Sequence, residues 1–119
     1  LRQVPDDFSV YSGDDSTALA LMLCGAKGNI SVVANVAPKN MHLMCAAAIK
    51  GDVETACKLN SLLLPLSQQL FVEPNPVPVK WAMAEMGMIP PGIRLPLVPL
   101  AEEYRAGVRK ALEESGVLA

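Results

Sequence analysis

The stretch Asn29-Ile30-Ser31-Val32-Val33-Ala34-Asn35 is almost continuously apolar and is rich in β-branched residues. A run of this kind predicts a strand buried on both faces, as in parallel sheets that are covered by helices. A shorter β-rich run, Phe8-Ser9-Val10-Tyr11-Ser12, precedes it and ends at Gly13-Asp14-Asp15. The residues from Thr17 to Cys24 between these runs have a helical pattern, which Asp14, Asp15 or Ser16 could cap. The order predicts a strand, a helix and a parallel strand.

Only helices and irregular segments are expected after Asn35. Pro38 fits the first turn of a helix that ends at Gly51-Asp52. The apolar stripe from Val53 to Leu70 predicts a second helix, which Pro65 should kink or reset. Further on, the pattern predicts an extended Pro-rich segment over 73–78, a helix over 79–86, a Pro-rich traverse over 89–99 and a final helix over 101–115.

Two parallel strands do not make an independent fold, because both sheet edges would expose unpaired backbone groups. The pattern alone therefore predicts the tail of a larger α/β protein whose other strands lie upstream. The chain has 119 residues. Of these, 51% are hydrophobic, so some side chains are expected to pack against protein outside this sequence.

The composition argues against several classes of partner. The formal net charge of −2 and the aromatic content of 4% give no basic, base-stacking surface for nucleic acid. No apolar run reaches the length of a membrane span, and the first residues lack a signal-peptide pattern. The three cysteines, Cys24, Cys45 and Cys57, lie in apolar helical patterns and are expected to be small, reduced core residues, which suits a cytoplasmic protein.

Five segments, in order and at matching spacing, resemble the dihydrodipicolinate synthase family. They are Tyr11-Ser12-Gly13-Asp14-Asp15, Gly28-Asn29-Ile30-Ser31-Val32, Ala34-Asn35-Val36, Glu73-Pro74-Asn75-Pro76-Val77-Pro78-Val79-Lys80-Trp81-Ala82 and Arg94-Leu95-Pro96-Leu97. The resemblance covers essentially the whole chain. One minor departure is Val33, where the family commonly has threonine.

The resemblance implies an α/β fold, the C-terminal part of a TIM (β/α)₈ barrel. Such a barrel typically needs about 250 residues. Residues 1–52 would hold the last two parallel strands with their helices, and residues 53–119 would form an all-helical C-terminal extension.

The resemblance also implies a lyase of lysine and diaminopimelate biosynthesis that uses no cofactor. In this family pyruvate forms a Schiff base with a lysine of the sixth barrel strand, and the resulting enamine attacks the aldehyde of aspartate semialdehyde. Cyclisation then gives 4-hydroxy-tetrahydrodipicolinate. That lysine, and the tyrosine and threonine that carry protons, would lie upstream of Leu1, so no catalytic residue is expected in this chain, which should be inactive alone.

Four residues are candidates for binding substrate at the C-terminal ends of the strands. The resemblance implies that the backbone of Ile30 contacts pyruvate, although its side chain by itself would be a core residue. It also implies that Gly13 leaves room for the aldehyde. Asp14 follows Gly13, and taken alone it would be a helix cap. Asn75 is a weaker candidate near the substrate entrance, and its plain alternative is a turn hydrogen bond between prolines.

Two further residues are not assigned to the chemistry. Lys80 lies near a helix N-terminus, but the family places its nucleophile on a strand, so Lys80 is interpreted as structural. His42 is the only histidine, and no second ligand stands at a suitable spacing, so no metal site is expected.

Two alternatives remain open. One is another Schiff-base aldolase, similar to N-acetylneuraminate lyase, although the loop at Gly13 and the segment from Glu73 to Lys80 favour the synthase. The other is a natural, non-catalytic half-barrel that serves as an interaction module. For the synthase, the expected partners are pyruvate, aspartate semialdehyde, the missing N-terminal barrel portion and further subunits of a homotetramer.

Overall fold

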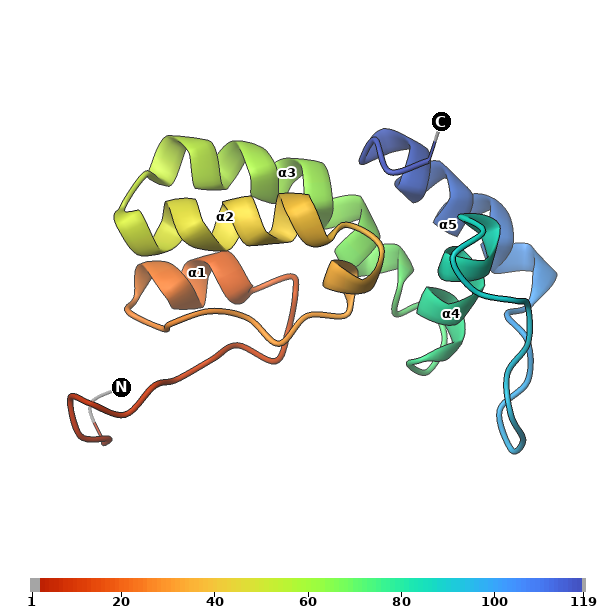
Figure 1. The fold of residues 1–119 in the computed structure, drawn as a ribbon, viewed down its shortest axis with the longest axis horizontal. Coiled ribbons are helices and arrows are strands. Elements are labelled where there is room, and N and C mark those ends of the chain that lie inside the picture. The colour runs from red at the N-terminus through yellow and green to blue at the C-terminus, as the bar shows by residue number, and fades with distance from the viewer. Residues whose placement is uncertain (1–2, 119) are drawn as a thin grey trace.

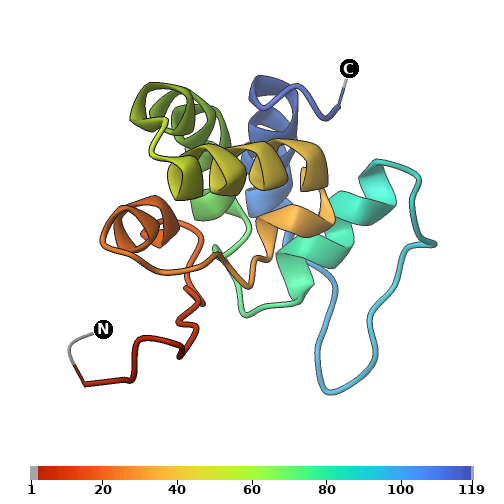
Figure 2. The ribbon, with the colours of Figure 1, turned by 60° about the vertical axis from the view of Figure 1, so that its left-hand side comes forward.

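The computed structural model describes residues 3–118, which form five α-helices and one short 3₁₀ helix. In chain order these are α1 (Ala18–Leu23), η1 (Val33–Asn35), α2 (Pro38–Lys50), α3 (Val53–Gln69), α4 (Val77–Glu85) and α5 (Glu102–Glu114). Helices α1, α2 and α3 lie side by side at one end, and α4 and α5 lie at the other (Figure 1). Helix α3 packs against both α2 and α5 and so joins the two groups, as a second view also shows (Figure 2).

Helices α2, α3 and α5 begin and end within one residue of the predicted positions, whereas α4 begins at Val77, inside the segment predicted as extended over 73–78. Pro38 stands in the first turn of α2, and Gly51 ends that helix with a left-handed φ of 79°, which glycine adopts without steric cost. The Asp52 side chain then accepts a hydrogen bond from the Thr55 N–H and caps α3. Glu102 and Glu103 place negative charge in the first turn of α5.

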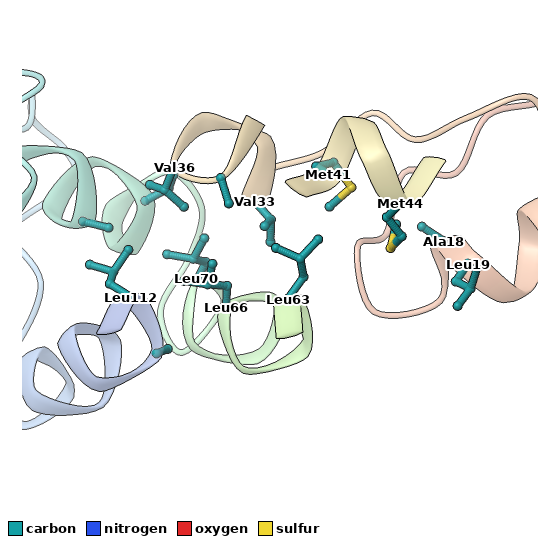
Figure 3. Packing of buried hydrophobic residues seen from close by; sticks show 14 of the residues in the cluster. Ala18, Leu19, Val33, Val36, Met41, Met44, Leu63, Leu66, Leu70 and Leu112 are labelled. Carbon is teal, nitrogen blue, oxygen red and sulfur yellow. The ribbon is translucent and has the colours of Figure 1, made fainter. Parts of the chain in front are cut away.

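The core forms where α3 meets the segments on either side of it. Leu63, Leu66 and Leu70 recur at three- and four-residue spacing on α3 and are at most 1% exposed. They lie beside Val33 and Val36 from the η1 region and Leu112 from α5, whereas Met44 of α2 lies next to Ala18 and Leu19 of α1 (Figure 3). The 3₁₀ segment is thus anchored in the core through its apolar side chains.

A reset of the helix at Pro65, one of the two outcomes expected from the sequence, does not occur in α3. The helix runs without interruption from Val53 to Gln69, with Pro65 inside it. Proline removes one backbone donor and crowds the preceding turn. Leu63 and Leu66 are buried on either side of Pro65. Because their packing depends on a continuous helix, core burial offsets the local cost.

The two predicted strands are not formed as strands among residues 3–118. Neither Phe8 to Ser12 nor Asn29 to Asn35 is extended and paired along its length; a single parallel β-bridge joins Ser12 to Asn29. The parallel direction agrees with the prediction, but the barrel part of the fold is not seen in this structure. A strand is stabilised by neighbours on both sides, and here each segment has the other on one side only.

The run Val33–Asn35 is helical rather than extended, and the reason is a distant side chain. The Asp15 carboxylate accepts hydrogen bonds from the consecutive N–H groups of Val32 and Val33, at 2.9 and 3.0 Å. Adjacent N–H groups point to the same side in a helical turn and to opposite sides in a strand. The tertiary contact therefore overrides the β-branched composition.

Candidate functional site

The candidate site lies where the residues before α1 run beside the segment before η1. The Ser12 N–H donates to the Gly28 carbonyl at 2.9 Å, and the Ile30 N–H donates to the Ser12 carbonyl at 2.8 Å. Gly28 has a φ of +157°, and a Cβ at this position would approach the Tyr11 ring to 3.2 Å. Glycine thus lets the two segments come together at this point.

The loop that follows Ser12 is held by its own side chains. Ser12 Oγ donates to the Asp14 carbonyl at 2.9 Å and accepts from the Asp14 N–H at 3.1 Å. Asp14 Oδ2 accepts from the Thr17 N–H at 2.9 Å and from the Thr17 hydroxyl at 2.6 Å. Asp14 therefore orders the turn that leads into α1, and its second carboxylate oxygen forms no hydrogen bond with the described residues.

Ile30 is 72% exposed, so the expectation that its side chain belongs to the core is wrong for this chain. Its N–H is committed to Ser12. Its carbonyl oxygen accepts no hydrogen bond from residues 3–118. The backbone acceptor at Ile30 is consequently the group that remains available for a ligand.

Gly13 and Asn75 are both exposed. A Cβ built at Gly13 meets nothing within 4 Å, so the space beside this loop is open. The Asn75 side chain forms no hydrogen bond with the described part of the chain, which differs from the turn hydrogen bond considered as an alternative. Asn75 comes just before α4, and α4 contacts η1. This contact joins α4 to the 3₁₀ segment that follows Ile30 in the chain.

Sequence reasoning missed the group that connects these segments. Asp15 is 3% exposed, and its carboxylate bonds to Asn29 Nδ2 at 2.7 Å as well as to the N–H groups of Val32 and Val33. In the sequence, Asp15 was only one of several candidate helix caps. A single sequence carries no signal that pairs it with residues in the next segment.

Cysteine and histidine do not form a second site in the described residues. Cys45 on α2 is half-buried, and burial, followed by the negative charge of Asp15, raises the pKa of its thiol. Cys24 and Cys57 are exposed, so the expectation that they are core residues is wrong. His42 is exposed on α2, and residues 3–118 contain no cluster of three His, Cys, Asp or Glu side chains placed to hold a metal ion.

Lys80 lies away from this loop, in α4. It is half-buried and lines an open cavity of about 330 Å³ with Trp81, Leu100 and Arg105. The Arg109 guanidinium lies 5.6 Å from the centre of the Trp81 ring and pairs with Glu85, which ties α5 to α4. None of the helices in the described range is long and apolar enough to cross a membrane.

Comparison with known proteins places these features in a family. The Dihydrodipicolinate synthetase family model matches residues 1–115. The chain is 64% identical, over 118 residues, to the 4-hydroxy-tetrahydrodipicolinate synthase of Herminiimonas arsenicoxydans, covering 99% of this chain and 40% of that protein. The chain belongs to the dihydrodipicolinate synthetase family.

Solved structures agree with this assignment. The chloride-inhibited dihydrodipicolinate synthase of Acinetobacter baumannii, complexed with pyruvate, superposes with a TM-score of 0.90 at 57% identity, covering 93% of this chain and 38% of that one. The dihydrodipicolinate synthase of Thermotoga maritima superposes with a TM-score of 0.93 at 45% identity, covering 98% and 40%. The chain thus spans about 40% of the length of these relatives.

Proposed function

We propose that this chain is the C-terminal part of a 4-hydroxy-tetrahydrodipicolinate synthase, a lyase of lysine and diaminopimelate biosynthesis that condenses pyruvate with aspartate semialdehyde. Residues 1–52 would complete the barrel and line its mouth, and residues 53–119 would form the helical extension. The lysine that forms the Schiff base would come from the upstream portion of the complete enzyme.

The observation that carries this proposal is the free carbonyl of Ile30, held beside the open space at Gly13. A carbonyl oxygen only accepts hydrogen bonds, so it finds no partner on free pyruvate and would bind a group that donates. When a lysine amine adds to the keto carbon of pyruvate, the carbinolamine carries a hydroxyl and an N–H. Either group could donate to Ile30, which would favour the adduct over free pyruvate.

Gly13 and Asp14 would line the path of the second substrate. The open space beside Gly13 would admit the aldehyde toward the enamine. Asp14 keeps one carboxylate oxygen free while the other orders the turn. The exposed Asn75 side chain would lie at the entrance. A subunit contact through the exposed side chains of α1, among them Leu21 and Leu23, would fit a homotetramer in the cytoplasm.

The proposal is tested by trapping the Schiff base. The complete enzyme, incubated with pyruvate and borohydride, should gain the mass of one reduced adduct per subunit on an upstream lysine. The isolated chain should keep its mass, because Lys80 lies on α4 rather than in the loop of Ile30. A stoichiometric adduct on Lys80 would show that the nucleophile has been misplaced.

The substrates that the complete enzyme turns over distinguish the synthase from the related aldolase and from an interaction module. The complete enzyme should consume pyruvate with aspartate semialdehyde. Cleavage of N-acetylneuraminate instead would favour the related aldolase. If the complete protein formed no adduct with pyruvate at all, an interaction module would be the better explanation.

A further inference from the structure

Asp15 is a buried carboxylate whose hydrogen bonds all lead to one short segment. Oδ1 accepts from Asn29 Nδ2 at 2.7 Å, and Oδ2 accepts from the N–H groups of Val32 and Val33 at 2.9 and 3.0 Å. No lysine or arginine in the described range forms an ion pair with it. Burying an unpaired charge is costly, and several hydrogen bonds to it offset that cost.

These hydrogen bonds fall on both sides of Ile30. Asn29 directly precedes Ile30, and Val32 follows two positions later. The Ile30 N–H is itself bonded to the Ser12 carbonyl at 2.8 Å. The residues on either side of the Ile30–Ser31 peptide are therefore held by hydrogen bonds, while the Ile30 carbonyl oxygen keeps no partner among residues 3–118. This is the arrangement expected of a preorganised acceptor.

The Gly13 loop does not depend on Asp15 in the same way. Ser12 Oγ bonds to the backbone of Asp14, and Asp14 bonds to Thr17, so the loop has its own hydrogen bonds. Loss of the Asp15 carboxylate should therefore disturb the segment over 29–33 more than the loop over 12–14.

We propose that Asp15 is a positioning residue that holds the Ile30 carbonyl in the orientation that binds the adduct of pyruvate with the lysine, acting through Asn29, Val32 and Val33. The inference rests on the proposed function. It adds a residue whose side chain contacts no substrate and whose effect is confined to the pyruvate half of the reaction.

Because of Asn29, a substitution at Asp15 can remove the negative charge and still keep the hydrogen bonds. The Oδ1 atom of Asn29 is buried and has no donor among the described residues. In Asp15→Asn, the new amide oxygen could still accept from Val32 and Val33. Its NH₂ group would face Asn29, which could turn its amide over and accept with the oxygen that is now unpaired. Asp15→Asn should therefore keep the geometry, whereas Asp15→Ala removes all three bonds.

The experiment measures three quantities in the complete enzyme. They are the pyruvate concentration that gives half-maximal borohydride-trapped adduct, the KM for aspartate semialdehyde and the melting temperature. Asp15→Ala should raise the half-maximal pyruvate concentration about tenfold or more, the effect of losing hydrogen bonds to a charged group. The KM for the aldehyde should stay within about threefold, and Asp15→Asn should restore pyruvate binding to within about threefold of wild type.

Two further variants complete the design. Asn29→Ala removes one of the three bonds and should show a smaller loss of the same kind, so it decides the question if Asp15→Ala does not fold. Asp52→Ala removes a carboxylate that caps a backbone N–H at the start of α3, away from the site. It should lower the melting temperature and leave pyruvate binding unchanged.

Three results would overturn the proposal. The first is a lower melting temperature with unchanged pyruvate binding in Asp15→Ala, or in Asn29→Ala if the former does not fold. The second is an Asp15→Asn enzyme as impaired as Asp15→Ala, which would mean that the charge itself acts on the substrate. The third is an equal rise in both substrate constants. If wild-type enzyme forms no adduct with pyruvate, the proposed function itself fails and the role of Asp15 falls with it.

Discussion

Gly13 has no side chain, and substituting larger residues there tests whether the open space beside the loop admits the second substrate. No φ in the left-handed region requires glycine there, and a Cβ would meet no atom within 4 Å. A larger residue should therefore leave the chain folded and project into the open space beside the loop. If that space admits the aldehyde, the substituent will obstruct the second substrate and spare the first.

We expect Gly13→Ala, Gly13→Val and Gly13→Leu in the complete enzyme to lower kcat/KM for aspartate semialdehyde progressively, by about tenfold or more for the largest. Formation of the trapped pyruvate adduct should change much less. Steady-state kinetics and borohydride trapping on the same preparations give both quantities. Equal losses in the two steps, accompanied by a lower melting temperature, would mean that Gly13 acts only through folding.

Cys45 offers a test of electrostatics at the same scale. Burial, and then the charge of Asp15, raises the pKa of its thiol above the ordinary value of 9.0. A raised pKa leaves a smaller fraction of thiolate at any pH below it, and the thiolate is the species that reacts. In the folded complete enzyme at pH 8, iodoacetamide should therefore label Cys45 more slowly than the exposed Cys57, as peptide mass spectrometry can measure.

Unfolding provides the control for this prediction. In denaturant the two thiols should react at similar rates, because burial and the fixed distance to Asp15 are lost. Asp15→Asn should speed the labelling of Cys45 only in part, since burial is the larger cause of the shift. Equal rates at Cys45 and Cys57 in the folded enzyme would contradict the environment described for Cys45.

The contact between α3 and α5 contains a glycine whose replacement by alanine should stabilise the folded protein. Gly107 lies inside α5, and a Cβ there would come within 2.6 Å of Gln69 Oε1. That atom is the end of a flexible side chain that forms no hydrogen bond with the described residues. A neighbouring cavity of about 280 Å³, lined by Pro65, Gln68 and Glu114 among others, leaves room for Gln69 to move.

Gly107→Ala in the complete enzyme should therefore raise the free energy of unfolding by about 0.5–1 kcal/mol, the usual gain for alanine over glycine inside a helix. Denaturant unfolding of matched preparations would measure this. Leu112→Ala, at a fully buried position of the same helix, is the control and should destabilise by about 2–5 kcal/mol. A loss at Gly107→Ala would mean that Gln69 cannot move aside.

The elements show which parts of this fold can be predicted from a single sequence. Helices α2 and α5 were predicted because their ends carry local signals, such as Pro38, Gly51 and Gly116. The η1 segment was predicted wrongly as a strand. Its shape depends on hydrogen bonds to Asp15, 17 and 18 residues away in the sequence, which no local pattern reveals.

The candidate site likewise contains residues that can be predicted from the sequence and one contact that cannot. Ile30 was proposed from the resemblance alone, because a backbone acceptor has no signature in the identity of its side chain. Gly13 and Asp14 were found through the loop motif that they share with the family. The pairing of Asp15 with Asn29 was not predicted, since it becomes visible only when the two segments lie side by side.

At the scale of the whole molecule, the chain is less compact than an independent domain of its size. Its accessible surface is 7260 Å². A compact monomer of 12.6 kDa would expose about 6,200 Å². Its radius of gyration is 15.3 Å, against about 13.5 Å for a globular chain of this length. The excess surface fits a chain that buries part of itself against further protein.

The residues that carry this excess are large and apolar. Ile30, Tyr11 and Phe8 are more than half exposed in the segments expected to join a sheet. Leu21 and Leu23 on α1 and Val53 and Leu62 on α3 are exposed on the helical side. We interpret the first group as the face that meets the missing barrel portion, and part of the second, on α1, as a contact between subunits.

The isolated 119-residue chain is therefore expected to aggregate or to stay compact without fixed side-chain packing. Each apolar side chain left in water forfeits roughly 1.5–3 kcal/mol, and a whole domain has a net stability of only about 5–15 kcal/mol. The exposed side chains of the two groups together are enough to cancel that margin.

Light scattering, near-ultraviolet circular dichroism and binding of a hydrophobic dye would show whether the isolated chain aggregates or lacks fixed packing. Adding the N-terminal barrel portion, if it folds and docks, should restore solubility and bring back pyruvate trapping. A monodisperse monomer of the chain alone with a sharp cooperative melt would contradict this account, because it would mean that the open bridge and the exposed apolar faces cost little and that the half-barrel is a domain in its own right.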